Sequence, residues 1–372
     1  MVLFTPAELG SLSLPNRFVR SATAERMATA AGRPLAALLD LYRQLVSGGV
    51  GLIITGHMYV DAGGKCHPEM TGIHEDDLIP DLAALVEGVH EVGGKVAVQI
   101  NHGGMQCSRD TVAQTVAPSD INVEFLQQPA RALTEEEIGE TIRAFAQAAG
   151  RARLAGFDAV QLHGAHGYLI NQFLSPYVNR RTDAWGGSLE NRMRFLREVC
   201  RAVRVEVGED YPVFIKLGLA DSPDLEPGLS LEDGLAVVAA CSDMKLDGVE
   251  VSGGIGGSRN LNSPTRIRRP DDEAYFRAWA RAAREVSSDG AVALPIMLVG
   301  GLRSLPVMED VLASGDADFI SLCRPLICEP DLPARLRAGQ ERATCISGNR
   351  CWPVGVEEGI ACKCRLPKQE VA

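Results

Sequence analysis

The sequence contains no long apolar run and no excess of basic residues. Of its 372 residues 46% are hydrophobic, yet no stretch of about 18 consecutive apolar residues occurs, so we expect no membrane partner. The formal net charge of −11 argues against a nucleic acid or an anionic membrane surface as partner, because both require a basic face. Residues 1–16 lack the basic start and apolar run of a secretory signal.

A disulfide framework is also missing. The ten cysteines are scattered along the chain as far as residue 330 and then crowd together after Thr344. In a chain of this length, that distribution is typical of a reducing compartment. We therefore expect a cytoplasmic protein.

The chain does contain eight short apolar, β-branched runs, each followed by a segment of helical periodicity. The predicted strands are Arg17–Ser21, Gly51–Gly56, Lys95–Asn101, Ala159–His163, Val213–Gly218, Gly248–Ser252, Pro295–Gly300 and Phe319–Cys323. Predicted helices include Leu35–Ser47, Leu78–Val92, Thr134–Ala155, Leu189–Val207 and Leu231–Met244, and Thr134 with Glu137 has the pattern of a capping box.

This alternation predicts one α/β domain, a closed (β/α)8 TIM barrel over residues 1–335, followed by a short cysteine-containing C-terminal extension over residues 336–372. The alternative, a doubly wound dinucleotide-binding sheet, requires a G-x-G-x-x-G turn after a strand. The glycine-rich stretch 252–258 lacks the third glycine at that spacing.

Polar residues gather where the predicted strands end, at the mouth of such a barrel. His57, His102, His163 and His166 follow three successive strands. His163 and His166 could direct two N–H donors at one carbonyl oxygen, and Tyr168 could supply a proton at neutral pH. A structural histidine or a metal site remains an alternative; against a metal, strand one offers no His-x-His pair and nearby carboxylates are few.

A second group of residues follows the last two predicted strands. Gly300 and Gly301 end strand seven, and Cys323 and Arg324 end strand eight. Backbone N–H groups freed by glycines, together with an arginine, form a phosphate cradle at this position of many barrels. An ordinary tight turn beside a surface arginine is the other interpretation.

Residues 163–176, 179–183 and 185–192 resemble the signature of the old yellow enzyme flavoproteins. The similarity is greatest to the branch that includes 2,4-dienoyl-CoA reductase and trimethylamine dehydrogenase, and it extends from Leu3 to about Pro330. The resemblance implies FMN at the barrel mouth, NAD(P)H as electron donor and a small-molecule alkene as substrate. We expect a homo-oligomer.

The resemblance also implies roles for individual residues. Tyr168 matches the proton donor, and His163 with His166 matches the pair that binds the substrate carbonyl. The residues that match the FMN site are Ser21, Ala22, Thr23, Gly56, Gln99, Lys216, Gly300, Gly301, Cys323 and Arg324. Lys216 stands where the family usually has arginine near flavin N1 and the C2 oxygen, which could change the redox tuning.

The implied reaction has two halves: NAD(P)H reduces FMN, and the flavin then passes hydride to an alkene conjugated to a carbonyl. The reverse chemistry is the alternative, as desaturation of a ring ketone or oxidative removal of a methyl or amine group. A flavin-binding electron carrier and a barrel aldolase or metallohydrolase are further possibilities, the aldolase resting on Lys216 as a Schiff-base lysine.

The C-terminal extension departs from the branch it resembles. Relatives there carry a [4Fe–4S] cluster on four cysteines, whereas here Gly348 replaces the second cysteine and Cys351 comes one place early. We expect no cluster and no bound metal, although Cys345, Cys351, Cys362 and Cys364 could supply four ligands in another arrangement, for zinc for example. We also expect the added dinucleotide-binding domains of those relatives to be absent. Met105 replaces a basic residue, which could alter the substrate pocket or a contact between subunits.

Overall fold

The fold is a closed barrel of eight parallel strands, seen here in a computed structural model. The structure describes residues 1–372 except 124–125, 256–262, 266, 288–292, 352–358 and 365–372. The barrel strands are β3 (Phe18–Arg20), β4 (Leu52–Ile54), β6 (Val96–Asn101), β9 (Ala159–Gly164), β10 (Val213–Gly218), β11 (Val249–Ser252), β12 (Ile296–Val299) and β13 (Phe319–Leu322). Pairing runs from β4 through β3, β13, β12, β11, β10 and β9 to β6, and β6 pairs with β4, which closes the ring. The TIM-barrel prediction is confirmed.

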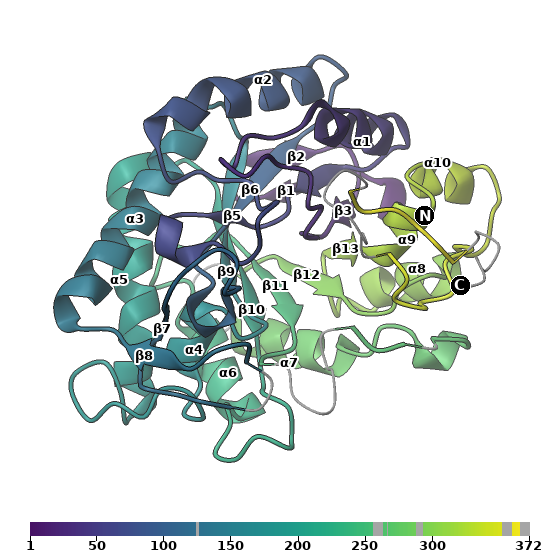
Figure 1. Ribbon diagram of the computed structural model, residues 1–372. Helices are drawn as coiled ribbons and strands as arrows, with labels where there is room; N and C mark the ends of the chain where they lie inside the picture. The colour runs from purple at the N-terminus through teal and green to yellow at the C-terminus, as the bar shows by residue number, and fades with distance from the viewer. Residues whose placement is uncertain (124–125, 256–262, 266, 288–292, 352–358, 365–372) are drawn as a thin grey trace, which may run out of the picture.

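Helices surround the strands on the outside (Figure 1). They are α1 (Ala36–Ser47), α2 (Ile79–His90), α3 (Glu135–Leu154), α5 (Leu189–Val207), α6 (Leu231–Ala239), α7 (Arg277–Ser287), α8 (Leu305–Ala313) and α10 (Leu332–Arg337). The capping box predicted for the third helix is present: Thr134 Oγ1 accepts from the N–H of Glu137, and the Glu137 carboxylate accepts from the N–H of Thr134. The predicted helix Leu231–Met244 was too long. The helix α6 ends at Ala239, and the chain then turns and reaches Lys245, which adopts a φ of 58°.

A small antiparallel hairpin closes the amino-terminal end of the barrel. Its strands are β1 (Ala7–Leu9) and β2 (Leu12–Leu14), and Leu9, Leu12 and Leu14 are buried. They form an apolar cluster with side chains from the beginnings of the barrel strands, among them Phe214 and Phe319. Chemistry is therefore left to the opposite end, where the strands finish.

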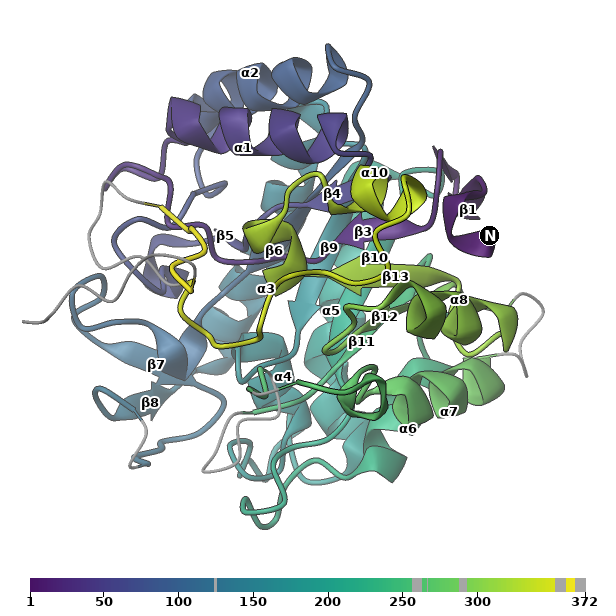
Figure 2. The ribbon, with the colours of Figure 1, turned by 90° about the vertical axis from the view of Figure 1, so that its right-hand side faces the viewer.

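The carboxyl-terminal end carries the long connections and the short extra elements. These are β5 (Met58–Tyr59), β7 (Thr115–Ala117), β8 (Ala130–Ala132), α4 (Leu169–Leu174), α9 (Arg324–Cys328) and the 3-10 turns Ala62–Gly64, Asp76–Leu78, Gly104–Gln106 and Pro270–Asp272. The tail after α10, drawn in yellow in Figure 2, crosses this side of the molecule. The described part of this tail contacts the barrel: the N–H of Ala343 donates to the carbonyl oxygen of Arg303 at 2.9 Å. The 3-10 turn Val2–Phe4 lies at the opposite end, where the carbonyl oxygen of Leu3 accepts from the N–H of Arg17 just before β3.

All ten cysteines are free thiols, so the disulfide framework that the sequence argued against is not formed. None of the helices in the described part of the chain combines the length and the apolar character that a bilayer crossing requires.

Candidate active site

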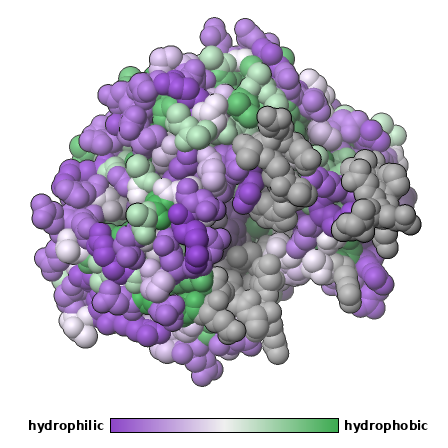
Figure 3. Space-filling model, viewed as in Figure 1, coloured by the Kyte–Doolittle hydropathy of each residue, from purple (hydrophilic) through white to green (hydrophobic). Residues whose placement is uncertain are grey.

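A cavity of about 350 Å³ opens at the carboxyl-terminal end of the barrel. In Figure 3 a hollow lies near the middle of the visible face. The cavity is lined by these predicted site residues: Ala22, Thr23, Gln99, His163, His166, Tyr168, Gly300, Gly301, Cys323 and Arg324. Ser21, Gly56 and Lys216 are not among the lining residues. The structure thus brings together residues that are up to about 300 positions apart in the chain.

The histidine pair sits where β9 turns into α4. His163 Nδ1 accepts a long hydrogen bond of 3.4 Å from the N–H of Ala165, which leaves the Nε2–H of the neutral ring as a donor. His166 Nε2 lies 2.7 Å from Ser252 Oγ, and the two imidazole centroids are 5.1 Å apart. His166 adopts a φ of 64°, an uncommon conformation for a non-glycine residue, and the turn holds both rings at the cavity wall.

Both imidazoles are neutral at physiological pH. Burial is the largest cause that lowers the pKa of His163 and of His166 well below the ordinary value. The positive charge of Lys216 acts in the same direction on both rings. A pair of neutral rings suits hydrogen bonding to a carbonyl oxygen.

Tyr168 stands next to this pair. Its ring centroid is 4.6 Å from that of His163 and 5.0 Å from that of His57, which also lines the cavity. Burial raises the pKa of the Tyr168 phenol well above 10, so the hydroxyl keeps its proton at neutral pH. The side chain can therefore act as a proton donor.

The other histidine predicted at a strand end, His102, serves the fold. Its Nδ1 accepts from the N–H of Gly104 at 3.1 Å, and it does not line the cavity. Met105, the residue that departs from the family pattern, is also away from the cavity wall and packs in an apolar cluster with Ile255.

A buried polar network from four strands begins at Gln99 in the cavity wall and continues behind the wall. Gln99 Nε2 donates to Gln161 Oε1 at 2.7 Å, and Gln161 Nε2 donates to Glu250 Oε2 at 2.9 Å. Ser21 Oγ donates to Glu250 Oε1 at 2.7 Å and accepts from Lys216 Nζ at 2.7 Å. Lys216 is thus engaged behind the wall, which argues against its use as a Schiff-base lysine.

Gly56 supports the loop after β3. Its N–H donates to Glu25 Oε1 at 3.0 Å, and a Cβ at this position would lie 1.9 Å from Glu25 Oε2. Glu25 is itself buried and paired with Arg20 at 2.8 Å. Gly56 therefore helps to fix the chain that includes Thr23.

At the other end of the cavity, Gly300 and Gly301 have φ angles of 135° and 71°. The ring of Tyr275 packs against both, and a Cβ on Gly301 would lie 2.9 Å from that ring. Arg303 and Arg324 line this end. The guanidinium of Arg303 donates to the carbonyl oxygens of Ile267 and Ala343, and that of Arg324 donates to the carbonyl oxygen of Pro264 and to Asn349. Sequence reasoning missed Tyr275 and Arg303.

The cavity also contains a polar atom with no protein partner. Ser321 on β13 is buried, and within the described residues its Oγ has no hydrogen-bond partner. An orphaned hydroxyl, a glycine turn and two arginines fit a phosphorylated ligand. The residues present therefore fit the cofactor that the family resemblance implies.

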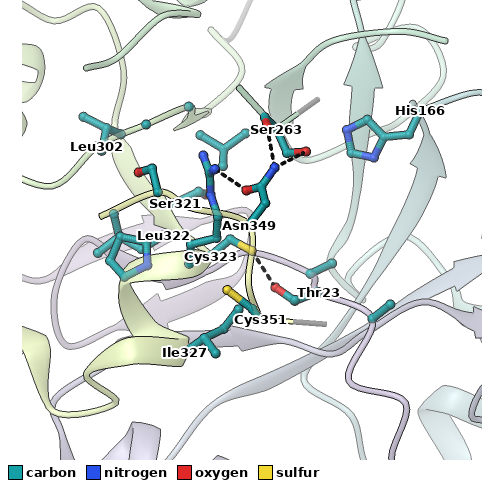
Figure 4. Close-up of a pocket in the computed structure, with 18 of the residues that line it drawn as sticks. Thr23, His166, Ser263, Leu302, Ser321, Leu322, Cys323, Ile327, Asn349 and Cys351 are labelled. Carbon is teal, nitrogen blue, oxygen red and sulfur yellow. Dashed lines mark hydrogen bonds between the residues drawn. The ribbon is translucent and has the colours of Figure 1, made fainter. Parts of the chain in front are cut away.

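The C-terminal tail completes this end of the cavity, which sequence reasoning also missed. Asn349, labelled in Figure 4, accepts at Oδ1 a hydrogen bond of 2.6 Å from the guanidinium of Arg324. Asn349 Nδ2 donates to the carbonyl oxygen of Ser263 at 2.9 Å, and Cys351 lines the cavity next to Cys323. Cys323 Sγ lies 3.0 Å from Thr23 Oγ1.

Within the part of the chain that the structure describes, no three His, Cys, Asp or Glu side chains are arranged to hold a metal ion. This set includes the four tail cysteines named above and the histidines of the cavity. The expectation of an empty tail stays a prediction.

Comparison with known proteins identifies the family. Residues 2–343 match the profile of the NADH:flavin oxidoreductase / NADH oxidase family. The chain belongs to that family, which confirms the resemblance to old yellow enzyme.

Two relatives and one solved structure illustrate the match. A protein named NADH oxidase from Thermoanaerobacter brockii is 36% identical over 93% of this chain, which spans 52% of that relative. A protein named NADPH dehydrogenase from Geobacillus sp. (strain WCH70) is 34% identical, with 94% of this chain and 96% of the relative covered. The structure of a 2-naphthoyl-CoA reductase in complex with 2-naphthoyl-CoA has a TM-score of 0.84 at 27% identity, covering 92% of this chain and 54% of that one. The chain is thus about half as long as some relatives and nearly as long as others.

Proposed function

We propose that this enzyme is an FMN-dependent ene-reductase, which uses NAD(P)H to reduce the C=C bond of α,β-unsaturated carbonyl compounds. The observation that carries the proposal is the convergence of three groups at one cavity wall. His163 and His166 are neutral hydrogen-bonding rings, and Tyr168 is a phenol that holds its proton. A carrier of electrons alone would need no such set.

The residues that would hold FMN divide by the part of the cofactor that each meets. Ala22 and Thr23 would lie along the ring system and Gln99 at its pyrimidine edge, while Lys216 would act on that edge through its charge from behind the wall. The glycines and Arg324 at the far end of the cavity would meet the phosphate. FMN, when bound, would accept hydride from NAD(P)H and supply hydride to the substrate.

The protein groups then have separate tasks. His163 Nε2–H would donate to the substrate carbonyl oxygen, where negative charge builds in the transition state. His166 would be oriented by Ser252 for the same oxygen. Tyr168 would deliver its phenolic proton to the α-carbon, and its high pKa keeps the proton available across the neutral range.

The test is stopped-flow measurement of the two half-reactions with wild-type enzyme and Tyr168→Phe. We expect the variant to reoxidise with an enone such as cyclohexenone about 10²- to 10⁴-fold more slowly, the range of general acid catalysis. Its reduction by NAD(P)H should remain within about twofold, because that half-reaction needs no proton from Tyr168.

Equal rates in both half-reactions would remove Tyr168 from the mechanism. Purified wild-type protein that neither contains nor binds FMN would overturn the whole proposal. Faster flavin reduction by saturated ketones or methylated amines than by NAD(P)H would instead establish the reverse, dehydrogenase-type chemistry.

A further inference from the structure

Glu250 on β11 is a fully buried carboxylate, with 0% of its surface exposed. A buried ionised carboxylate is costly unless it is paired and hydrogen-bonded. Glu250 meets both conditions, but the fold alone does not require a charge in the middle of this strand. Its neighbours Val249 and Val251 are apolar and equally buried.

The contacts of Glu250 lead to residues that the proposed function places around the flavin. Its Oε1 accepts from Ser21 Oγ at 2.7 Å and lies 3.4 Å from Lys216 Nζ. Its Oε2 accepts from Gln161 Nε2, and Gln161 in turn accepts from Gln99. One carboxylate thus holds three of the residues expected at the cofactor, directly or through one amide.

Lys216 is the only ion-pair partner of Glu250 among the described residues, and the reverse also holds. Both side chains are at least 95% buried, where charges interact more strongly than in water. Glu250 therefore offsets much of the positive charge that Lys216 would otherwise present.

We propose that Glu250 lowers the reduction potential of the bound flavin by offsetting the charge of Lys216, and that it positions Lys216 and Gln99 through the buried network. This inference rests on the proposed function. A cation at the N1–C2 oxygen edge stabilises the reduced, anionic flavin and raises its potential. A cation that already faces a carboxylate stabilises the reduced flavin less. The potential is then lower, and the reduced flavin is a stronger hydride donor.

The test uses the FMN-loaded enzyme and the isosteric variant Glu250→Gln, which removes the charge and keeps a polar side chain. We expect the potential measured by spectroelectrochemical titration to rise, with the reduction equilibrium at least tenfold more favourable. That factor corresponds to about 30 mV for a two-electron couple. Sulfite, which adds to flavin N5 and leaves an anionic ring, should bind more tightly in parallel.

A neutral change in the same network is the control. Ser21→Ala removes one hydrogen bond of Glu250 and one of Lys216 without changing either charge, so its potential should stay closer to wild type than that of Glu250→Gln. Equal shifts in the two variants would show that packing, and not charge, sets the potential, and would overturn the proposal.

Glu250→Gln leaves Lys216 buried without its partner, which can impair folding. A second pair of variants therefore tests the same charge effect independently. Lys216→Met should lower the potential, since the negative charge of Glu250 is then unopposed. Adding Glu250→Gln to Lys216→Met removes the whole ion pair, a change that cores tolerate, and should raise the potential again. If the reduction potentials of Lys216→Met and of the double variant are equal, the inference is overturned.

The two proposals fail in different ways. Wild-type protein that binds no flavin overturns the proposed function. If the wild-type protein binds FMN and reduces enones, but Glu250→Gln has the same reduction potential as the wild type, only the role of Glu250 is overturned.

Discussion

At the scale of single residues, the short turn from His163 to Tyr168 concentrates the expected chemistry. The positive φ angles of His166 and Gly167, 64° and 78°, belong to a tight turn that points several polar groups at one cavity. Strain of this kind is tolerated where the surrounding structure holds it, and Asn171 does so here by accepting the N–H of Gly167 at 2.8 Å.

The histidine pair yields a direct binding prediction. Replacing His163 by Ala should weaken the binding of a phenol such as p-hydroxybenzaldehyde by about tenfold to hundredfold, since a hydrogen bond to a charged oxygen is lost. The measurement is a titration of the flavin absorbance of FMN-loaded protein. His90→Ala is the control, because His90 lies on the outer helix α2 and pairs with Asp158. Unchanged affinity in His163→Ala would sink the carbonyl site.

At the scale of elements, the tail after α10 is built into the site. The N–H of Ala343 donates to the carbonyl oxygen of Arg303 at 2.9 Å, and Ser347, Asn349 and Cys351 all line the cavity. The segment therefore has a structural role at the cavity, although its cysteines do not match the cluster pattern. It closes the end of the cavity where we place the phosphate.

Asn349 provides the test of this role. Asn349→Ala should weaken FMN binding by roughly tenfold, because the guanidinium of Arg324 loses one of its two acceptors and keeps only the carbonyl oxygen of Pro264. Riboflavin lacks the phosphate, so its affinity should not change. Flavin fluorescence quenching on addition of apoprotein measures both affinities.

The exposed neighbour Arg350 supplies the matched control. Arg350→Ala should bind both flavins as wild type does. If Asn349→Ala weakened riboflavin and FMN equally, the tail would be stabilising the barrel mouth in general and not the phosphate contact.

At the scale of the whole molecule, the polar mouth affects stability as well as catalysis. Burial lowers the pKa of His57 and His67 to about 3 and that of His102 to about 4. The unfolded chain has histidine pKa values near 6.5, so below that pH the unfolded state binds more protons than the folded state. The contribution of these histidines should therefore be constant above about pH 7, and stability should fall as the pH decreases from about 6.5 towards 4.

Each such histidine contributes a slope of up to about 1.4 kcal/mol per pH unit in that window. Urea unfolding of the protein at pH 7.5, 6.0 and 5.0 measures the sum. His67→Gln should reduce the proton uptake on unfolding by about one, while His90→Gln, at the surface, should leave it unchanged. A free energy of unfolding that is the same at pH 7.5 and pH 5.0 would contradict these pKa directions.

Much of the site could be predicted from the sequence because a parallel barrel collects the ends of its strands at one face. Once eight strand–helix repeats were recognised, His163, Gly300 and Arg324 had to lie near the same mouth. Glu250 and Gln161 were missed because a polar residue inside an apolar strand has no local pattern. The partners of Glu250 are also distant in the chain: Gln161 is 89 positions away and Ser21 is 229 positions away.

The sequence by itself determined the barrel, the order of its elements and the segment that carries the histidines and the tyrosine. These depend on hydrophobic periodicity and turn chemistry, which act over a few residues. Only the tertiary structure decided which side chains share the buried network around Glu250, how deeply the histidines are buried, and that Asn349 of the tail meets Arg324. Those features depend on distances across the barrel and on exclusion of water, and neither is encoded in the spacing of residues along the chain.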